Sequence, residues 1–217
     1  MVKKSDRGQF KGRNTGARKR NAIILIAAEG NNKTEENYFR QFPCKKYNIR
    51  FSKGNETDPK KMMGHLLEDC ENMGIGQEAG DRAFCLVDND VDVQKDCQIA
   101  KADEMARKSK KKAAQIVSNP CFEVWYLCHK KYSTKQYASS QEVIDALTEL
   151  FGDYKKQDPN MCAKTIADIA TACDNAKKLE SFNLDAGRKP HTASFLPSTE
   201  VYKVIEAIRD AENSKSR

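Results

Sequence analysis

The sequence has no long apolar segment. Its longest apolar run is residues 22–28 (AIILIAA), far shorter than the roughly 18–20 residues that a membrane-spanning helix requires. The basic N-terminus also lacks the apolar core and small-residue cleavage site of a secretory signal peptide. We therefore predict a cytoplasmic protein that has no membrane partner.

Cysteine pairs at metal-binding spacing are absent as well. The chain has eight cysteines and three histidines, but no two cysteines form a CxxC motif and no histidine stands where a zinc finger needs one. Cys85, Cys121 and Cys128 lie inside apolar runs. This pattern favours buried, reduced thiols over a zinc site or a disulfide framework.

Beyond its first twenty residues the chain has no excess of positive charge. Residues 1–20 hold eight of the 38 basic residues and one of the 31 acidic ones, which leaves 30 of each for the remainder and accounts for the whole net charge of +7. We predict that residues 1–20 form a flexible basic arm, which is either simply solvated or binds nucleic acid or a partner. The neutral body does not bind nucleic acid through bulk positive charge.

Strand and helix patterns alternate along the first 132 residues. Two short apolar runs, 22–28 and 83–87, are typical of buried strands, and further strands are predicted at 48–52 and 113–117. Helices are predicted at 34–41, 59–74 and 96–111, and another begins at Pro120 after a turn at 118–120. Such alternation specifies an α/β fold with a parallel sheet core flanked by helices. Residues 21–132 form this predicted core, and 133–217 form a helical C-terminal region packed on it, with helices at 140–151, 160–179 and 198–211.

Acidic residues follow two of the predicted strands. Glu29 comes directly after the first strand, and Asp88 and Asp90 follow the strand at 83–87. Ligands bind at the carboxyl ends of parallel strands, so these carboxylates should meet at one sheet edge. Carboxylates held together favour a hard cation between them, and we predict Mg²⁺ or Mn²⁺ there. The alternative is that such acids only cap the helices that follow.

Two other motifs are excluded at the same positions. Residues 88–92 imitate the start of a calcium-binding EF-hand loop, but Val93 stands at the sixth position and Ile99 at the twelfth, where glycine and glutamate are needed. Residues 30–34 imitate part of a P-loop but lack the glycine before the lysine.

Taken together, these segments resemble a known family. A Glu after the first strand and a DxD after a later one resemble the Toprim domain of topoisomerases, bacterial primases and OLD-type nucleases. The wider pattern is similar to the RloB family, which resembles abortive-infection proteins of phage defence. The matching segments are 28–30 (AEG), 34–39 (TEENYF), 88–90 (DND), 118–125 (SNPCFEVW) with His129, 154–156 (YKK) and 197–202 (PSTEVY).

The resemblance implies a function and a set of site residues. It implies a Toprim-like fold and a Mg²⁺- or Mn²⁺-dependent nuclease that acts in anti-phage defence, with RNA such as tRNA favoured over DNA. An ABC/AAA-type ATPase encoded nearby is the implied partner. Glu29, Asp88 and Asp90 are the implied metal ligands, with Glu29 as an alternative general base.

Several further residues are candidates near that edge. Glu35 is a candidate ligand of a second metal, and Asp92 is either an additional ligand or a helix cap. Glu123 is either a ligand or an acid at a helix start. Ser118 and Asn119 are predicted to support the ligands, and His129 is more typical of a buried structural histidine than of a catalytic base.

Basic residues near the edge are candidates for binding the nucleic-acid backbone. Lys33 lies closest in sequence to the acids, and the others either contact phosphate or are solvated. These are Lys108, Lys110, Lys111, Lys112, Lys155 and Lys156, with Arg188 and Lys189 as weaker candidates.

Two rival functions differ in class from a nuclease. In one, the chain is a non-catalytic regulator or docking partner of the ATPase and the acids are structural. In the other it transfers nucleotides, as primases do, but the sequence contains no separate primase or topoisomerase domain.

Overall fold

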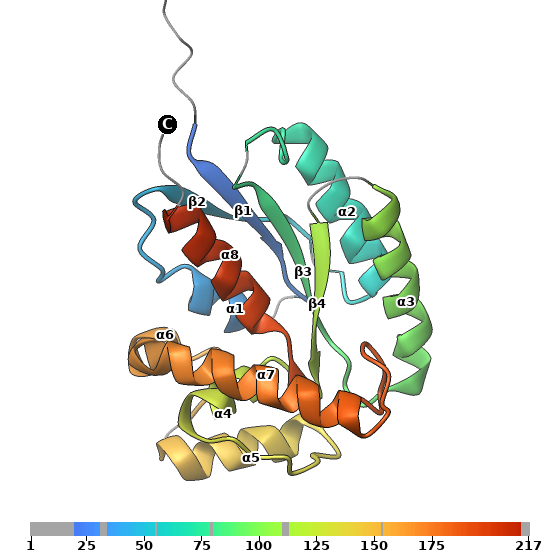
Figure 1. Ribbon diagram of the computed structural model, residues 1–217, viewed down its shortest axis with the longest axis vertical. Helices are drawn as coiled ribbons and strands as arrows, with labels where there is room; N and C mark the ends of the chain where they lie inside the picture. Colours follow the sequence, from blue (N-terminus) through green and yellow to red (C-terminus); the bar gives the residue numbers. More distant parts are fainter. Residues whose placement is uncertain are drawn as a thin grey trace, which may run out of the picture.

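Five strands form one mostly parallel sheet (Figure 1). The computed structural model describes residues 20–30, 34–54, 56–78, 80–109, 113–152 and 154–213. The strands are β1 (Ala22–Ala27), β2 (Tyr47–Phe51), β3 (Arg82–Asp88), β4 (Ala113–Asn119) and β5 (Ser198–Thr199), in the order β2-β1-β3-β4-β5. The first four are parallel, and β5 is antiparallel to β4. The predicted α/β class with a parallel sheet core is confirmed.

Alternating residues of the strands supply two separate cores. Ile24, Ile26, Phe84 and Leu86 face one side of the sheet, whereas their neighbours Leu25, Ala27, Ala83, Cys85 and Val87 face the other. Both sets are apolar because helices cover both faces of a parallel sheet.

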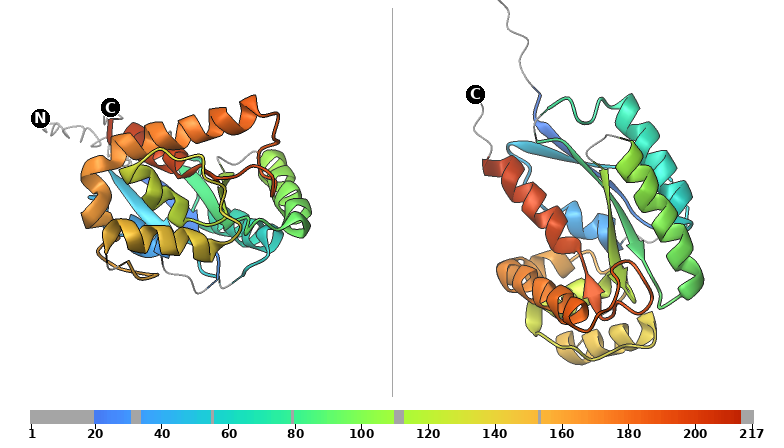
Figure 2. Two further views of the ribbon diagram at one scale, coloured as in Figure 1. Left: turned by 90° about the horizontal axis from the view of Figure 1, so that it is seen from below. Right: turned by 45° about the vertical axis from the view of Figure 1, so that its right-hand side comes forward.

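Helices α2 (Pro59–Asn72) and α3 (Val93–Lys108) cover one face of the sheet, and α8 (Val201–Asn213) packs along the other (Figures 1 and 2). Helix α2 begins where predicted, because Asp58 accepts a hydrogen bond from the Lys61 amide and Pro59 occupies the first turn.

A second group of helices lies at the end of the sheet where β4 finishes (Figures 1 and 2). It contains α1 (Thr34–Phe39), α4 (Glu123–Lys130), α5 (Ser140–Phe151), α6 (Met161–Thr165), a 3-10 turn (Ile166–Asp168) and α7 (Ile169–Asp185). Helix α4 is buried along nearly its whole length, including Trp125, Tyr126 and Leu127. The predicted helical C-terminal region is therefore present, and among the described helices none is long and apolar enough to span a bilayer.

Several predicted boundaries are wrong, and α3 begins at Val93, three residues before the predicted start at residue 96. Ser118 and Asn119 are not a turn but the last residues of β4, because they pair with Thr199 and Ser198. Those two partners form β5, although the prediction placed them in a helix. The single helix predicted over 160–179 is divided at Thr165, whose hydroxyl donates to the carbonyl of Met161, and the last helix begins at Val201.

Residues 1–19 of the predicted arm, Lys33 and Lys110–Lys112 lie outside the described residues. Arg20, the last residue of the predicted arm, is described and is anchored to the fold. Its guanidinium pairs with the buried carboxylate of Asp81 at 2.7 Å.

Candidate functional site

The structure brings the acids that follow β1 and β3 together. Glu29 follows β1, Asp88 ends β3, and the Asp88 amide donates to Oε2 of Glu29 at 3.3 Å. Because β1 and β3 are adjacent and parallel, their carboxyl ends place these two residues at one edge. The predicted meeting of strand ends is therefore present in the fold.

The loop after β3 holds Asp90 in an unusual backbone conformation. Asp90 and Val91 have φ angles of 58° and 57°, a left-handed region that a β-branched residue such as Val91 rarely adopts. The Asp90 amide donates to the carbonyl of Pro120 at 2.9 Å, and the Val91 amide donates to Oδ1 of Asn119 at 3.3 Å. Contacts with the turn after β4 thus fix the position of the loop.

Asp92 has the helix-cap role that was one of its two predicted alternatives. It precedes α3, and its Oδ1 accepts a hydrogen bond from the Gln94 amide at 2.8 Å. This bond satisfies one of the free amides at the helix start.

Glu35 and Glu123 lie buried beside the strand-end acids. They are only 2% and 0% exposed. The Tyr154 hydroxyl donates to Oε1 of Glu123 at 3.0 Å, while Oε2 of each glutamate has no hydrogen-bond partner among the described residues. We call Glu29, Glu35, Asp88, Asp90 and Glu123 the acidic cluster.

Members of the acidic cluster repel one another, and this repulsion adds to the effect of burial on their pKa values. Burial, followed by repulsion from Glu123 and Glu29, raises the pKa of Glu35 to about 8. Burial also raises the pKa of Asp88 well above its usual range, with further contributions from Glu35, Glu123, Glu29 and Asp90. Burial and mutual repulsion thus favour the uncharged forms of Glu35 and Asp88.

A lysine that was not among the predicted site residues contacts two members of the cluster. Nζ of Lys95 lies 3.0 Å from Oε1 of Glu29 and 3.0 Å from Oδ2 of Asp90. Burial acts to lower the pKa of Lys95, but attraction to Glu29 and Asp90 outweighs it and the pKa is raised. The sequence predicts that this helix begins at residue 96, which leaves Lys95 outside it. Helix α3 instead begins at Val93 and places Lys95 in its first turn, where the helix dipole opposes a positive charge.

The cluster suits a divalent cation in its chemistry but not in its present arrangement. It offers only carboxylate oxygens, two of them without hydrogen-bond partners among the described residues, and such donors fit Mg²⁺ or Mn²⁺. Within the described part of the chain, no three His, Cys, Asp or Glu side chains are arranged to hold a metal ion. The ammonium of Lys95 instead supplies positive charge between Glu29 and Asp90.

Ser118 and Asn119 contact the chain that follows α7. The Ser118 hydroxyl pairs with that of Thr199 at 2.9 Å, on β5. Nδ2 of Asn119 lies within hydrogen-bond distance of three carbonyl oxygens, those of Thr192, Ala193 and Phe195. Asn119 thus connects the 191–197 segment to the Asp90 loop.

His129 is a buried structural residue. Its Nδ1 lies 2.9 Å from the carbonyl oxygen of Trp125 and its Nε2 lies 3.5 Å from the Tyr38 hydroxyl. Burial lowers the pKa of His129 to about 4, so the ring is neutral near pH 7.

The described basic candidates are divided between the cluster and the surface. Lys156 is exposed, and its pKa is raised because attraction to Glu123 and Asp88 outweighs its partial burial. Lys108 pairs with Glu104 at 2.6 Å, and Lys155 is exposed. Arg188 donates to Oδ1 of Asn183 and to the carbonyl of Leu196, each at 2.7 Å, and Lys189 is exposed.

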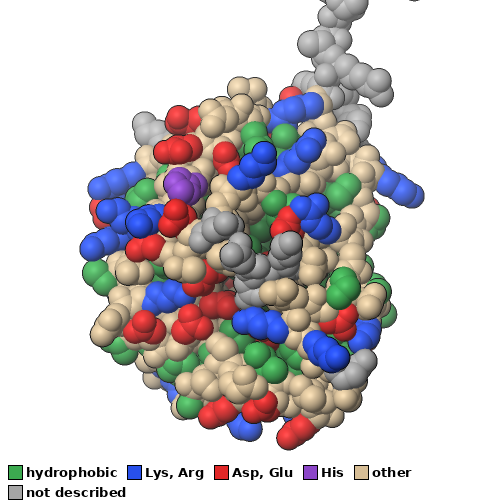
Figure 3. Space-filling view, turned by 180° about the vertical axis from the view of Figure 1, so that it is seen from behind, with side chains coloured by type: hydrophobic (Ala, Val, Ile, Leu, Met, Phe, Trp, Pro, Cys, Tyr) green, Lys and Arg blue, Asp and Glu red, His purple; other side chains and the backbone are tan. Residues whose placement is uncertain are grey.

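The surface shows no single basic face in the view of Figure 3. Acidic and basic side chains are interspersed there, as expected for a body whose formal charges cancel.

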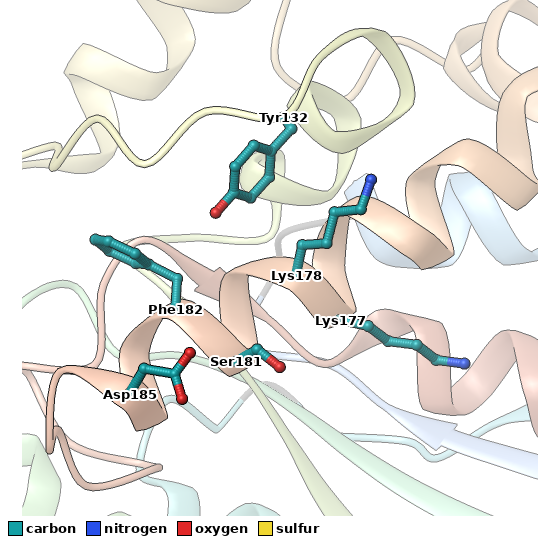
Figure 4. Close-up of a pocket in the computed structure, with 6 residues that line it drawn as sticks. All are labelled: Tyr132, Lys177, Lys178, Ser181, Phe182 and Asp185. Carbon is teal, nitrogen blue, oxygen red and sulfur yellow. The ribbon is translucent and has the colours of Figure 1, made fainter.

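An open groove of about 420 Å³ lies on α7 (Figure 4). Six residues line it, among them Tyr132, Lys178 and Phe182. Lys177 also lines it, but its side chain points away from Tyr132 and pairs with Glu206 at 2.5 Å. No member of the acidic cluster lines this groove.

Comparisons with known proteins identify one family. The model of the RloB-like protein family matches residues 24–208. No curated protein and no solved structure matches the chain. The match covers the sheet, the acidic cluster and most of the C-terminal helices, and the chain therefore belongs to the RloB-like family.

Proposed function

We propose that this chain is a metal-dependent nuclease that cleaves RNA in bacterial phage defence. The observation that carries the proposal is the acidic cluster, five carboxylates gathered at the end of the parallel sheet where ligands of α/β proteins bind. Membership of the RloB-like family supports the phage-defence context, as does the resemblance to Toprim nucleases.

Glu29, Asp88 and Asp90 would hold the metal, with Glu35 and Glu123 available to a second ion. Asp88 is oriented by the Phe122 amide, which donates to its Oδ1 at 2.8 Å. A bound Mg²⁺ or Mn²⁺ neutralises phosphate charge and lowers the pKa of water. Lys156 stands close enough to the cluster to attract a phosphate, and Lys33 is adjacent in sequence.

RNA, and tRNA in particular, is the substrate that we favour over DNA, and an ABC/AAA-type ATPase is the partner that restrains or activates the enzyme. Both follow from the family resemblance. The basic residues at the N-terminus are suited to the RNA backbone.

A second candidate is a non-catalytic docking partner of the ATPase. It is favoured by the ion pairs of Lys95, which compensate charge in the cluster without a metal. In that case the acidic cluster would serve folding or partner binding.

A nuclease assay on matched variants distinguishes the two. The purified protein, with and without the ATPase, is incubated with tRNA, single-stranded RNA and DNA in Mg²⁺, Mn²⁺ or chelator. Glu29→Gln and the double variant Asp88→Asn/Asp90→Asn are expected to lose cleavage and phage protection. Glu36→Gln is the control, because Glu36 lies on α1 beside Glu35 but pairs with Arg40 at the surface. Variants that lack the acids yet still protect cells would exclude the nuclease and favour the docking partner.

A further inference from the structure

Lys95 contacts carboxylate oxygens that a metal bound to the acidic cluster would need as its ligands. Its Nζ is 3.0 and 3.1 Å from the two carboxylate oxygens of Glu29 and 3.0 Å from Oδ2 of Asp90. The residue is 9% exposed, so its ammonium has little contact with solvent. The two carboxylates that it contacts come from separate strand ends.

The position of Lys95 is unfavourable without these acids. It is the third residue of α3, where the positive end of the helix dipole repels an ammonium, and burial removes the hydration of the charge. The contacts with Glu29 and Asp90 compensate for both effects. Lys95 therefore depends on the carboxylates, and they depend on it for neutralisation.

The single ammonium of Lys95 does not pair with every carboxylate of the acidic cluster. Among the described residues, Oε2 of Glu35 and Oε2 of Glu123 remain without hydrogen-bond partners. A divalent cation brings twice the charge and contacts oxygens at about 2.0–2.1 Å, closer than any ammonium. Lys95 and a metal cannot occupy the same contacts with Glu29 and Asp90 at once.

We propose that Lys95 is a tethered cation that occupies the metal position of the acidic cluster and is displaced when a divalent ion binds. The proposal rests on the proposed function, because it assumes that the cluster binds a metal. The flexible four-carbon stem of lysine allows the ammonium to leave while α3 stays in place. Lys95 thus preserves the cluster in its metal-free form and raises the metal concentration needed to load it.

The first test measures Mn²⁺ binding by calorimetry. Lys95→Met is expected to bind Mn²⁺ more tightly than the wild type, by on the order of tenfold, because competition is removed. It should also unfold at a lower temperature without metal. Lys101→Met is the control, because Lys101 is an exposed residue of the same helix.

The second test uses the wild-type protein and so does not depend on whether the variant folds. Reductive methylation of lysines is followed by mass spectrometry with and without Mn²⁺. Lys95 is expected to be protected without metal and reactive with it, whereas Lys101 reacts equally in both.

The outcomes separate this inference from the proposed function. If the wild type binds Mn²⁺ while Lys95→Met binds no more tightly, or if Lys95 stays protected in saturating Mn²⁺, the inference fails and the nuclease proposal stands. If neither protein binds Mn²⁺, both fail.

Discussion

Arg20 donates two hydrogen bonds to the carboxylate of Asp81, at 2.8 and 2.7 Å. Asp81 is fully buried and also accepts hydrogen bonds from the amides of Ile23, Gly76 and Glu78. A single carboxylate therefore connects the start of β1 with the turn that follows α2. The first described residue, Arg20, is thus held to the fold by Asp81.

Replacing Asp81 is expected to destabilise the folded protein. Asp81→Ala leaves Arg20 and three amides without their acceptor, and it should lower the free energy of unfolding by about 2–4 kcal/mol. Chemical denaturation measures the difference. Asp210→Ala, at an exposed aspartate of α8, should change stability by less than about 0.5 kcal/mol. Equal stabilities for the two variants would contradict the anchor role of Asp81.

Removing residues 1–19 is expected to weaken RNA binding but not metal binding. These residues contain seven basic side chains and one acid, and a truncation that keeps Arg20 preserves the Asp81 contact. The slope of log affinity against log salt should become shallower, by up to about 5, since each phosphate contact on a single strand contributes about 0.7. Binding titrations at several salt concentrations measure it. An unchanged slope would mean that these basic residues do not contact RNA and are either solvated or bound to a partner.

Asn119→Ala is expected to loosen two segments that are far apart in sequence. The Asn119 side chain contacts Val91 in the Asp90 loop and the carbonyls of Thr192, Ala193 and Phe195. Hydrogen exchange should become faster at residues 88–92 and 191–197 together. Asn175→Ala is the matched control, because Asn175 is also buried and donates to a single carbonyl, that of Cys128. Faster exchange at 88–92 in both variants would refute a specific connection.

The pH dependence of stability should report a second cluster, centred on His191. Its Nδ1 lies 2.8 Å from Oδ2 of Asp103 and its Nε2 lies 2.9 Å from Oε2 of Glu200. Burial alone would lower the pKa of His191, but the two carboxylates raise it to about 9. Burial would raise the pKa of Glu200, but His191 and Lys203 lower it to about 2.

The directions of these two pKa shifts define the pH range over which His191 and Glu200 stabilise the fold. The contribution of His191 is complete below its ordinary pKa of 6.5 and is lost as the pH rises through about 9. The contribution of Glu200 is complete above its ordinary pKa of 4.5 and is lost as the pH falls through about 2. Thermal unfolding should therefore show the wild type losing stability between pH 6.5 and 9 more steeply than His191→Gln. Parallel curves for the two proteins would rule out this ion pair as the cause.

Sequence periodicity predicted the core of the fold well because burial dominates there. The apolar runs that became β1 and β3, and the helix at 140–151, follow from local patterns and caps such as Ser139, which accepts from the Glu142 amide. The strand Ser198–Thr199 has no such pattern. It forms because Ser118 and Asn119 present a free edge of β4, a contact between residues about 80 positions apart.

The acids of the candidate site were also predictable, whereas their partners were not. Glu29, Asp88 and Asp90 stand at strand ends, and strand ends converge whatever the rest of the chain does. The contact of Lys95 with Glu29 spans 66 positions and depends on how α3 lies across the sheet. Local sequence therefore predicts which residues reach the edge but not which charges compensate them.

The contacts of Asn119 with residues 192–195 bear on which parts of the structure can form while the chain is being synthesised. Glu123, the last member of the acidic cluster in the sequence, comes well before Thr192. A nascent chain that ends near residue 190 thus carries all the acids but lacks the carbonyls and the strand that hold the end of β4. We therefore expect the Asp90 loop to reach its final position only after residues 192–199 have been added.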